Sequence, residues 1–138
     1  MDFMKIVKAT LSDIRILAQM NKRLIEDERH SNPMSVAQLE KRMTGWLQDA
    51  YTCYLVKKGD RSVAYCLFRE DTETYYMRQL FVERGYRRNH IATRLLDWMF
   101  QNVWPDKKVR LDVLSHNKEA IAFYEAYGFR TGALRMEK

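Results

Sequence analysis

The chain contains little of what builds a disulfide-stapled, metal-bound or membrane-embedded protein. Among its 138 residues there are two cysteines, two prolines and three histidines. Two cysteines are too few for a disulfide scaffold, and neither they nor the histidines show the spacing of metal ligands. No apolar run approaches the ~20 residues that a membrane-spanning helix needs. These absences exclude a disulfide-rich or zinc-stabilised scaffold, and we expect neither a bound metal nor a membrane partner.

The amino terminus gives no sign of a secretion signal. Its first residues alternate between apolar and polar, as in a strand, and include no apolar core of signal-peptide length. We therefore expect a cytoplasmic protein in which Cys53 and Cys66 stay reduced.

The charge is moderately basic, with a formal net value of +6. An anionic ligand and simple surface solubility explain this value equally well. A nucleic-acid-binding domain is not favoured, because no run of about five or more basic residues occurs. The arginines cluster at one helix start instead of along a face with interleaved aromatic residues.

Length and composition predict a single domain over residues 1–138, with 46% hydrophobic and 30% charged residues. Capping boxes, which mark helix starts, occur at Thr10 to Asp13 and at Ser35 to Gln38. Periodicity and turn residues predict, in order, a strand at 3–9, helices at 11–27 and 35–47, strands at 52–58, 61–69 and 74–82, a helix from 91 that ends before Pro105, a strand at 109–114, a helix at 118–127 capped by Asn117 and closed by Gly128, and a strand at 129–136.

This order predicts the topology of the sheet. The three central strands are joined by short turns, so we expect them to be antiparallel. A helical crossover joins 74–82 to 109–114, which makes those two strands parallel neighbours. The fold class is therefore α+β (α/β), with a mixed, mainly antiparallel central sheet flanked by helices.

The hairpin between 52–58 and 61–69 turns at Gly59 and Asp60. A two-residue turn there would place Cys53 directly opposite Cys66. We expect two buried thiols at these positions and no disulfide.

A basic loop carries the strongest chemical signal. Arg84, Arg87 and Arg88 lie between the end of strand 74–82 and the start of the next helix. The first amides of a helix lack intrahelical partners, and the helix dipole favours anions there. The loop is typical of a phosphate site, although a solvated basic loop is an equally good interpretation on these grounds alone.

Two segments together resemble the GNAT-type N-acetyltransferase superfamily. Residues 82–92 read VERGYRRNHIA and are similar to the family's acetyl-CoA motif, Gln/Arg-x-x-Gly-x-Gly/Ala, with Arg87 at its first position and Ala92 at its last. Residues 117–129 read NKEAIAFYEAYGF and resemble its second hallmark. The resemblance covers essentially the whole chain, and it implies the GNAT-like acyl-CoA N-acyltransferase fold and acetyl-CoA as co-substrate.

The resemblance also implies roles for residues. In this family the backbone of the strand end pairs with the pantetheine arm, the loop amides hold the pyrophosphate, and a tyrosine at position 124 protonates the leaving thiolate. The residues that it assigns to the cofactor are Leu80, Phe81, Val82, Arg87, Arg88, Asn89, His90, Ile91, Ala92, Thr93, Asn117 and Tyr124. A backbone N–H near Leu80 or Phe81 is expected to bind the developing oxyanion.

The base that deprotonates the amine is left open. Glu26, Asp27 and Glu28 follow the first helix, in the segment that covers the acceptor site in this family, and Glu73 begins a strand. Glu28 and Glu73 are the principal candidates beside Tyr124 as the acid. A solvated acidic surface is the alternative for each carboxylate.

Two features depart from the family pattern. His90 replaces the middle glycine of the motif, where a glycine lets the backbone approach the pyrophosphate closely. The residues after Tyr127 also leave room for one last strand or a short kinked pair, where the family usually has two strands. The sheet edge left there is one that a homodimer partner would cover.

The expected reaction is direct attack of a primary amine on acetyl-CoA in a ternary complex. The acceptor is a small-molecule or peptide amine, and a polyamine, an aminosugar, a peptide amino terminus and a protein lysine all suit an acidic loop. The alternative function is a catalytically inactive acetyl-CoA-binding sensor or interaction module.

Overall fold

The computed structural model describes residues 4–28, 33–106, 108–134 and 136–138. Within them one five-stranded sheet has the order β1 (Met4–Lys8), β2 (Tyr51–Lys58), β3 (Arg61–Glu70), β4 (Thr74–Val82) and β5 (Lys108–Arg110). The first four strands are antiparallel, and β5 runs parallel to β4. The predicted mixed, mainly antiparallel sheet is confirmed.

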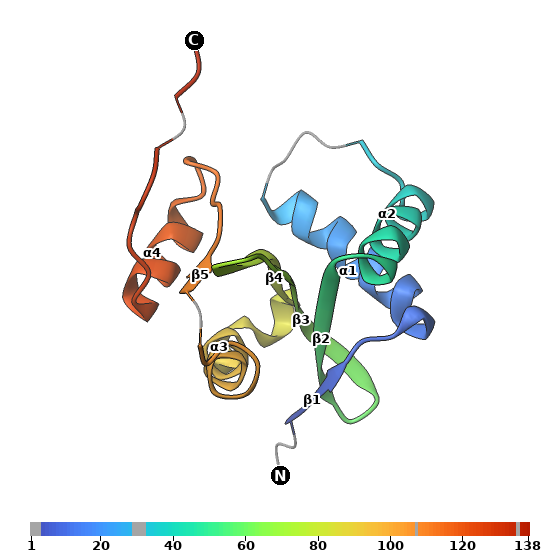
Figure 1. The fold of residues 1–138 in the computed structure, drawn as a ribbon. Helices are drawn as coiled ribbons and strands as arrows, with labels where there is room; N and C mark the ends of the chain where they lie inside the picture. Colours follow the sequence, from blue (N-terminus) through green and yellow to red (C-terminus); the bar gives the residue numbers. More distant parts are fainter. Residues whose placement is uncertain (1–3, 29–32, 107, 135) are drawn as a thin grey trace.

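Helices cover both faces of this sheet. In Figure 1, α1 (Ile14–Asp27) and α2 (Val36–Gln48) lie on one side, and α3 (Ile91–Asn102) and α4 (Lys118–Tyr127) lie on the other. The hydroxyl of Tyr127 donates to Asp97 Oδ1, 2.7 Å away, and so ties α4 to α3.

Both predicted capping boxes are confirmed. The Thr10 N–H donates to Asp13 Oδ2 at 2.8 Å, and the Ser35 N–H donates to Gln38 Oε1 at 2.8 Å. The first helix differs in one detail, because a 3₁₀ turn over Leu11–Asp13 precedes the α-helix proper. These caps satisfy backbone donors that a helix start otherwise leaves without partners.

Each face of the sheet has its own apolar core. The core beneath α3 is built from residues that include Cys66, Phe68, Met77, Leu95, Met99 and Trp104. The core beneath α1 and α2 is built from residues that include Leu17, Met20, Met43, Cys53, Tyr65, Leu67 and Phe81. Fully burying one such side chain stabilises a fold by roughly 1.5–3 kcal/mol, so both layers are held firmly to the sheet.

The predicted pairing of Cys53 with Cys66 is wrong. A β-bulge between Val56 and Lys57 shifts the register by one residue, so that Cys53 lies opposite Leu67 and Cys66 opposite Tyr54. A one-residue shift moves a side chain to the other face of the sheet. The two cysteines therefore belong to different cores, and both are free and buried as expected.

The carboxyl-terminal part departs most from expectation. The strand predicted at 109–114 is confined to Lys108–Arg110, and the strand predicted at 129–136 is wrong, since 129–134 and 136–138 contain no strand. An alternating sequence forms a strand only where a neighbouring edge accepts its hydrogen bonds. Here Leu134 and Met136 are 76% and 83% exposed instead. The helix limits are confirmed, because Asn117 caps α4 and Gly128 follows it at φ 126°.

Candidate active site

One edge of β4 is open over its second half. β4 pairs with β3 along almost its whole length, but with β5 only through Thr74, Tyr75 and Tyr76. Residues 77–82 therefore have no strand partner on the β5 side among the described residues. The backbone groups of Leu80, Phe81 and Val82 lie in this stretch, where an extended ligand can pair as an added strand.

A β-bulge lies in the same stretch. Leu67 pairs with Gln79 and Phe68 pairs with Met77, so Arg78 is the extra residue on β4. Bulges bend a strand and re-aim its side chains, and they are frequent next to active sites.

The basic loop leaves β4 in a defined conformation. The Glu83 N–H donates to the Val63 carbonyl at 2.8 Å, and residues Arg84–Asn89 form a 3₁₀ helix. Arg87 Nε donates to the Val82 carbonyl at 2.9 Å, which folds its guanidinium back onto the end of β4. The loop is therefore held in place before any ligand arrives.

Asp27, the last residue of α1, binds two of the loop arginines. Arg84 Nη2 donates to Asp27 Oδ1 at 2.8 Å, and Arg87 Nη2 donates to Asp27 Oδ2. In addition, Arg23 on α1 donates to Glu83 Oε1 at 2.8 Å. Asp27 is thus already paired with cations, which makes it a poor candidate for receiving a proton from an amine.

His90 has the backbone conformation that usually calls for glycine. Its φ of 57° and ψ of 27° are left-handed, and it is the only non-glycine residue with positive φ among the described residues. A left-handed conformation costs an L-residue about 1–2 kcal/mol. The loop therefore keeps the backbone conformation that a glycine would adopt, although His90 replaces the motif glycine. The replacement costs backbone strain at His90 and adds an exposed imidazole to the loop.

This end of the molecule has the features that a CoA pyrophosphate requires. α3 starts directly after His90, so the amides of Ile91, Ala92 and Thr93 belong to its first turn. Arg88, Asn89 and His90 are exposed around them. Unpaired amides, a helix dipole and loop arginines together suit a diphosphate. The residues present therefore fit the group.

Tyr124 is largely buried against the core beneath α3, with its ring 5.6 Å from that of Phe129. Burial raises the pKa of its phenol, and the nearby Cys66 thiol and Glu28 carboxylate add to the rise. Tyr124 therefore keeps its proton through the neutral range. It therefore cannot act as a base at neutral pH, and its phenol is available only as a hydrogen-bond or proton donor.

Glu28 is brought towards Tyr124 and Asn117 from the other side of the sheet edge. His116 Nε2 lies within hydrogen-bond distance, 3.0 Å, of the main-chain oxygen of Glu28. This contact joins the end of α1 to the segment between β5 and α4. Asn117 follows directly, and its Oδ1 accepts from the Ala120 N–H at 3.2 Å, which fixes the side chain as the helix cap.

The other acidic candidates lie elsewhere. Glu73 is exposed in the turn before β4. β4 has nine residues, and at ~3.3 Å per residue its two ends are roughly 26 Å apart, so Glu73 is far from the basic loop. Glu26 is exposed on α1. Of these candidates, Glu28 is the one whose main chain is joined to the segment before Asn117, through His116. The roles of all these residues stay predictions.

Sequence reasoning missed several polar residues on the α1/α2 face. The Tyr65 hydroxyl donates to Gln79 Oε1 at 2.8 Å, and Arg42 Nη2 donates to Asn21 Oδ1 at 3.1 Å. Asn21, Arg42 and Tyr65 come from α1, α2 and β3, so no sequence motif joins them. Their only sequence signal is a polar residue at an apolar position of the pattern, as with Asn21 beside Met20.

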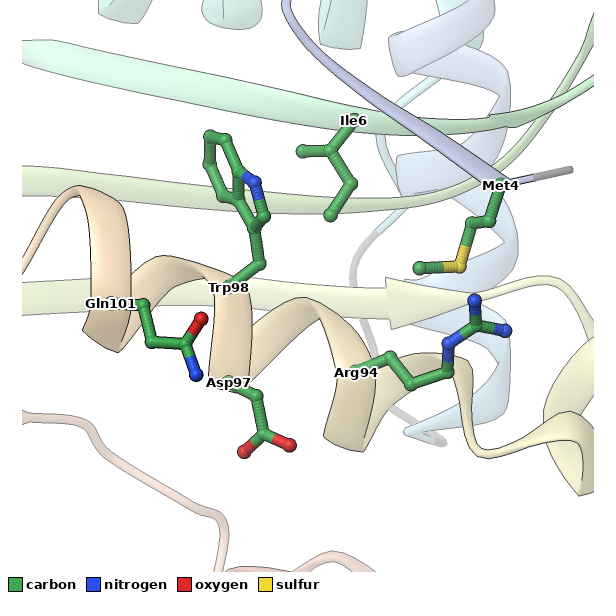
Figure 2. A pocket seen from close by; sticks show the side chains of 6 residues that line it. All are labelled: Met4, Ile6, Arg94, Asp97, Trp98 and Gln101. Carbon is green, nitrogen blue, oxygen red and sulfur yellow. The ribbon is translucent and has the colours of Figure 1, made fainter.

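A second hollow lies on the surface of the molecule, outside the candidate site. Figure 2 shows a hollow between β1 and α3, lined by Met4, Ile6, Arg94, Asp97, Trp98 and Gln101. It lies away from the open edge of β4.

Among the described residues there is no group of His, Cys, Asp and Glu side chains that could hold a metal ion, and no helix is long and apolar enough to cross a membrane.

Comparison with solved structures identifies close relatives of the fold. A possible acetyltransferase from Clostridium difficile 630 has a TM-score of 0.84 at 19% identity, with 99% of this chain and 97% of that chain covered. An aminoglycoside N-acetyltransferase in complex with CoA has a TM-score of 0.80 at 12% identity, with coverage of 100% and 95%. A predicted acetyltransferase with acetyl-CoA from Clostridium acetobutylicum has a TM-score of 0.77 at 19% identity, with coverage of 99% and 96%.

No curated protein matches the chain. Its sequence does match the model of the acetyltransferase (GNAT) family over residues 17–129, which include β4, the basic loop, α3 and α4. The match thus contains the open strand edge, the loop and Tyr124. The chain belongs to the GNAT family of acetyltransferases.

Proposed function

We propose that the chain is an acetyl-CoA-dependent N-acetyltransferase that transfers acetyl to a primary amine by direct attack in a ternary complex. The observation that carries the proposal is the open edge of β4 over residues 77–82, which leads without a break into the basic loop and the start of α3. An extended arm that ends in a diphosphate suits this arrangement.

The cofactor would be held along that path. The backbone of Leu80, Phe81 and Val82 would pair with the pantetheine arm, and the loop from Arg87 to Thr93 would hold the pyrophosphate. Asn117, positioned by its cap on α4, would contact the arm from the opposite side. Acetyl-CoA when bound supplies a thioester whose C–S bond breaks as the amine forms a C–N bond, so that the amine loses one proton and the thiolate gains one.

Three groups of the chain serve this exchange. A backbone N–H near Leu80 or Phe81 donates to the carbonyl oxygen. Tyr124 holds the proton that the thiolate takes up, because a phenol, with an ordinary pKa of about 10, is protonated at neutral pH and the proposed leaving thiolate would form beside it. Glu28, at the end of α1, receives the amine's proton through water. We favour Glu28 over Glu73 because its charge is felt at Tyr124.

A small-molecule or peptide amine is the proposed acceptor. An aminoglycoside N-acetyltransferase shares the fold, which supports a primary amine as the nucleophile. The cytoplasm is the proposed compartment, since two free, buried cysteines suit a reducing environment. A homodimer stays a prediction, which sedimentation of the purified protein would test.

Calorimetric titration with acetyl-CoA tests the proposal, with CoA release from a panel of amines measured next. We expect saturable one-to-one binding. Ligand at 100 times its dissociation constant should stabilise the fold by about 2.7 kcal/mol, which gives a thermal check. Binding without acetylation of any amine would favour the inactive sensor. Absence of binding by both wild type and His90→Gly would overturn both functions.

A further inference from the structure

Arginine and aromatic side chains alternate across the α1/α2 face of the sheet. The Arg42 and Arg78 guanidinium carbons lie 4.5 Å and 4.8 Å from the centroid of the Trp46 ring. Arg78 also lies 5.9 Å from the ring of Tyr51. The series continues towards β5 through Arg69, Tyr76 and Arg110. The expectation that the arginines gather at one helix start and not along a face with aromatic residues is therefore wrong, because this series brings several like charges and rings to one surface.

The arginines of this series are paired unequally. Arg69 and Arg110 both donate to the carboxylate of Asp71, at 2.9 Å and 3.1 Å. Within the described residues, Arg42 and Arg78 form no ion pair with any carboxylate. The pKa of Arg42 is lowered, first by burial and then by the charge of Arg78. Arg78 is exposed and donates from Nη1 to the Tyr51 hydroxyl at 3.2 Å, so its charge lies beside that of Arg42 with a neutral partner and open to a ligand.

Unused hydrogen-bond donors point to the same place. Arg42 Nε is buried and has no acceptor in the described part of the chain, and the same holds for Nδ2 of Asn21. Asn21 is 0% exposed, and its Oδ1 already accepts from Arg42. One of these unmet donors belongs to Arg42 itself and the other to its hydrogen-bond partner, so the Arg42 end of the series has donors that no acceptor among the described residues uses.

The unpaired arginines lie beside the proposed reaction centre. Arg78 is the bulge residue of β4, and Gln79 and Leu80 are the next two residues along the strand. Consecutive Cα atoms are ~3.8 Å apart, so Arg78 starts within roughly 8 Å of the backbone proposed to hold the thioester. The Arg78 guanidinium lies at the end of its side chain, so a group bound there would belong to an acceptor that extends from the proposed reaction centre to the Trp46 ring.

We propose that Arg42 and Arg78 bind an anionic group of the acceptor, so that the substrate class is a primary amine bearing a carboxylate or a phosphate. The guanidinium fork binds both groups bidentately. The inference rests on the proposed N-acetyltransferase function and narrows it. Asp27, which an acidic acceptor loop would offer to a cationic amine, is instead occupied by Arg84 and Arg87.

Matched amine pairs test this inference by acetyl-CoA-dependent CoA release. The panel sets L-phenylalanine beside its carboxamide, glucosamine 6-phosphate beside glucosamine, and L-lysine beside cadaverine, with spermidine and sisomicin as polycations. We expect kcat/KM to favour the anionic member of at least one pair by roughly tenfold or more. The first and third pairs report on a carboxylate, and the second reports on a phosphate.

Variants assign the preference to the two arginines. Arg42→Gln and Arg78→Gln should each raise KM for the anionic member roughly 10–100-fold. They should leave unchanged both the KM for the partner that lacks the carboxylate or phosphate and the dissociation constant of acetyl-CoA. Arg110→Gln, which alters an arginine of the same series that is paired with Asp71, is the control and should retain the preference. Arg42→Lys keeps the charge without the planar fork and should give an intermediate KM, which separates charge from misfolding.

Preference for the neutral members or the polycations would overturn the inference while leaving the N-acetyltransferase function standing. The same holds for a preference that survives both Gln variants. If no amine is acetylated, thermal stabilisation by the anionic amines in the presence of CoA becomes the measurement. Equal stabilisation of wild type and Arg42→Gln would then overturn the inference. If calorimetry shows that acetyl-CoA does not bind, the proposed N-acetyltransferase function is overturned, which is a different outcome from failure of this inference.

Discussion

Arg87 Nε and the main-chain oxygen of Val82 are 2.9 Å apart, so the first residue of the acetyl-CoA motif is hydrogen bonded to the last residue of β4. This contact fixes the loop against the end of the strand that the pantetheine is proposed to follow. A side chain without the guanidinium would release the loop and remove a charge from the phosphate site.

Arg87→Gln should therefore weaken acetyl-CoA binding. A hydrogen bond to a charged group contributes about 1.5–3 kcal/mol, which corresponds to roughly 10–150-fold in the dissociation constant. Calorimetry is the measurement. Arg15→Gln, which removes an exposed charge near the start of α1, at the opposite end of that helix from Asp27, is the control and should bind as wild type does. Equal affinity of Arg87→Gln and wild type would remove Arg87 from the phosphate site.

His90→Gly should stabilise the fold. A left-handed residue costs about 1–2 kcal/mol and glycine relieves this strain, but it adds about 0.5–1 kcal/mol of backbone entropy to be lost on folding. The net gain should be about 0.5–1 kcal/mol in urea unfolding. Asn89→Gly, one residue earlier and without a positive φ, should destabilise instead. Loss of stability in His90→Gly would mean that the imidazole makes contacts that outweigh the strain.

Tyr124→Phe should lower kcat by roughly 100-fold or more, the usual size of a general-acid contribution. The dissociation constant of acetyl-CoA should not change, because the aromatic ring remains. Tyr127→Phe is the matched control on the same helix. It should leave kcat unchanged and cost about 1 kcal/mol of stability through loss of the bond to Asp97. Equal kcat values for Tyr124→Phe and wild type would exclude Tyr124 as the acid.

The fold should lose stability at alkaline pH. Burial raises the pKa of the Cys53 and Cys66 thiols and of the Tyr65 phenol above their ordinary values near 9 and 10. Each neutral group therefore favours the folded state fully below its unfolded pKa, and that contribution is lost as the pH rises above it. Each group contributes a slope of about 1.4 kcal/mol per pH unit.

Urea unfolding between pH 7 and pH 11 measures this effect. The unfolding free energy should be level to about pH 8.5 and then fall. Replacing both cysteines by alanine should lower stability at pH 7 by opening two cavities, and it should also flatten the decline above pH 9. An equally steep decline in this variant would assign the effect to the tyrosines alone.

The sequence was a good guide wherever structure is local. The Ser35 box and the Asn117 cap each need a few adjacent residues, and both form as predicted. Register and edge pairing are not local. One extra residue near Val56 moved Cys53 away from Cys66, and the alternation after Phe129 did not form a strand without an edge to accept it.

The candidate site divides in the same way. The loop that holds Arg87 and His90 is contiguous and was predicted from the motif. Arg42 and Arg78 are far apart in the sequence and meet over Trp46 only after α2 packs on the sheet. Each looks like a surface arginine in the sequence, and only the three-dimensional structure shows that neither is paired with a carboxylate of the described residues.

If the proposed cofactor and acceptor sites are right, Asp27 would couple them. It closes α1, the helix that borders the acceptor side, and it binds the same arginines, Arg84 and Arg87, that are proposed to meet phosphate. A diphosphate that attracts these arginines competes with Asp27, and linkage makes such competition reciprocal. Occupancy of one half-site should thus alter affinity at the other, and Asp27→Asn should abolish this negative cooperativity in titrations of one substrate at fixed levels of the other.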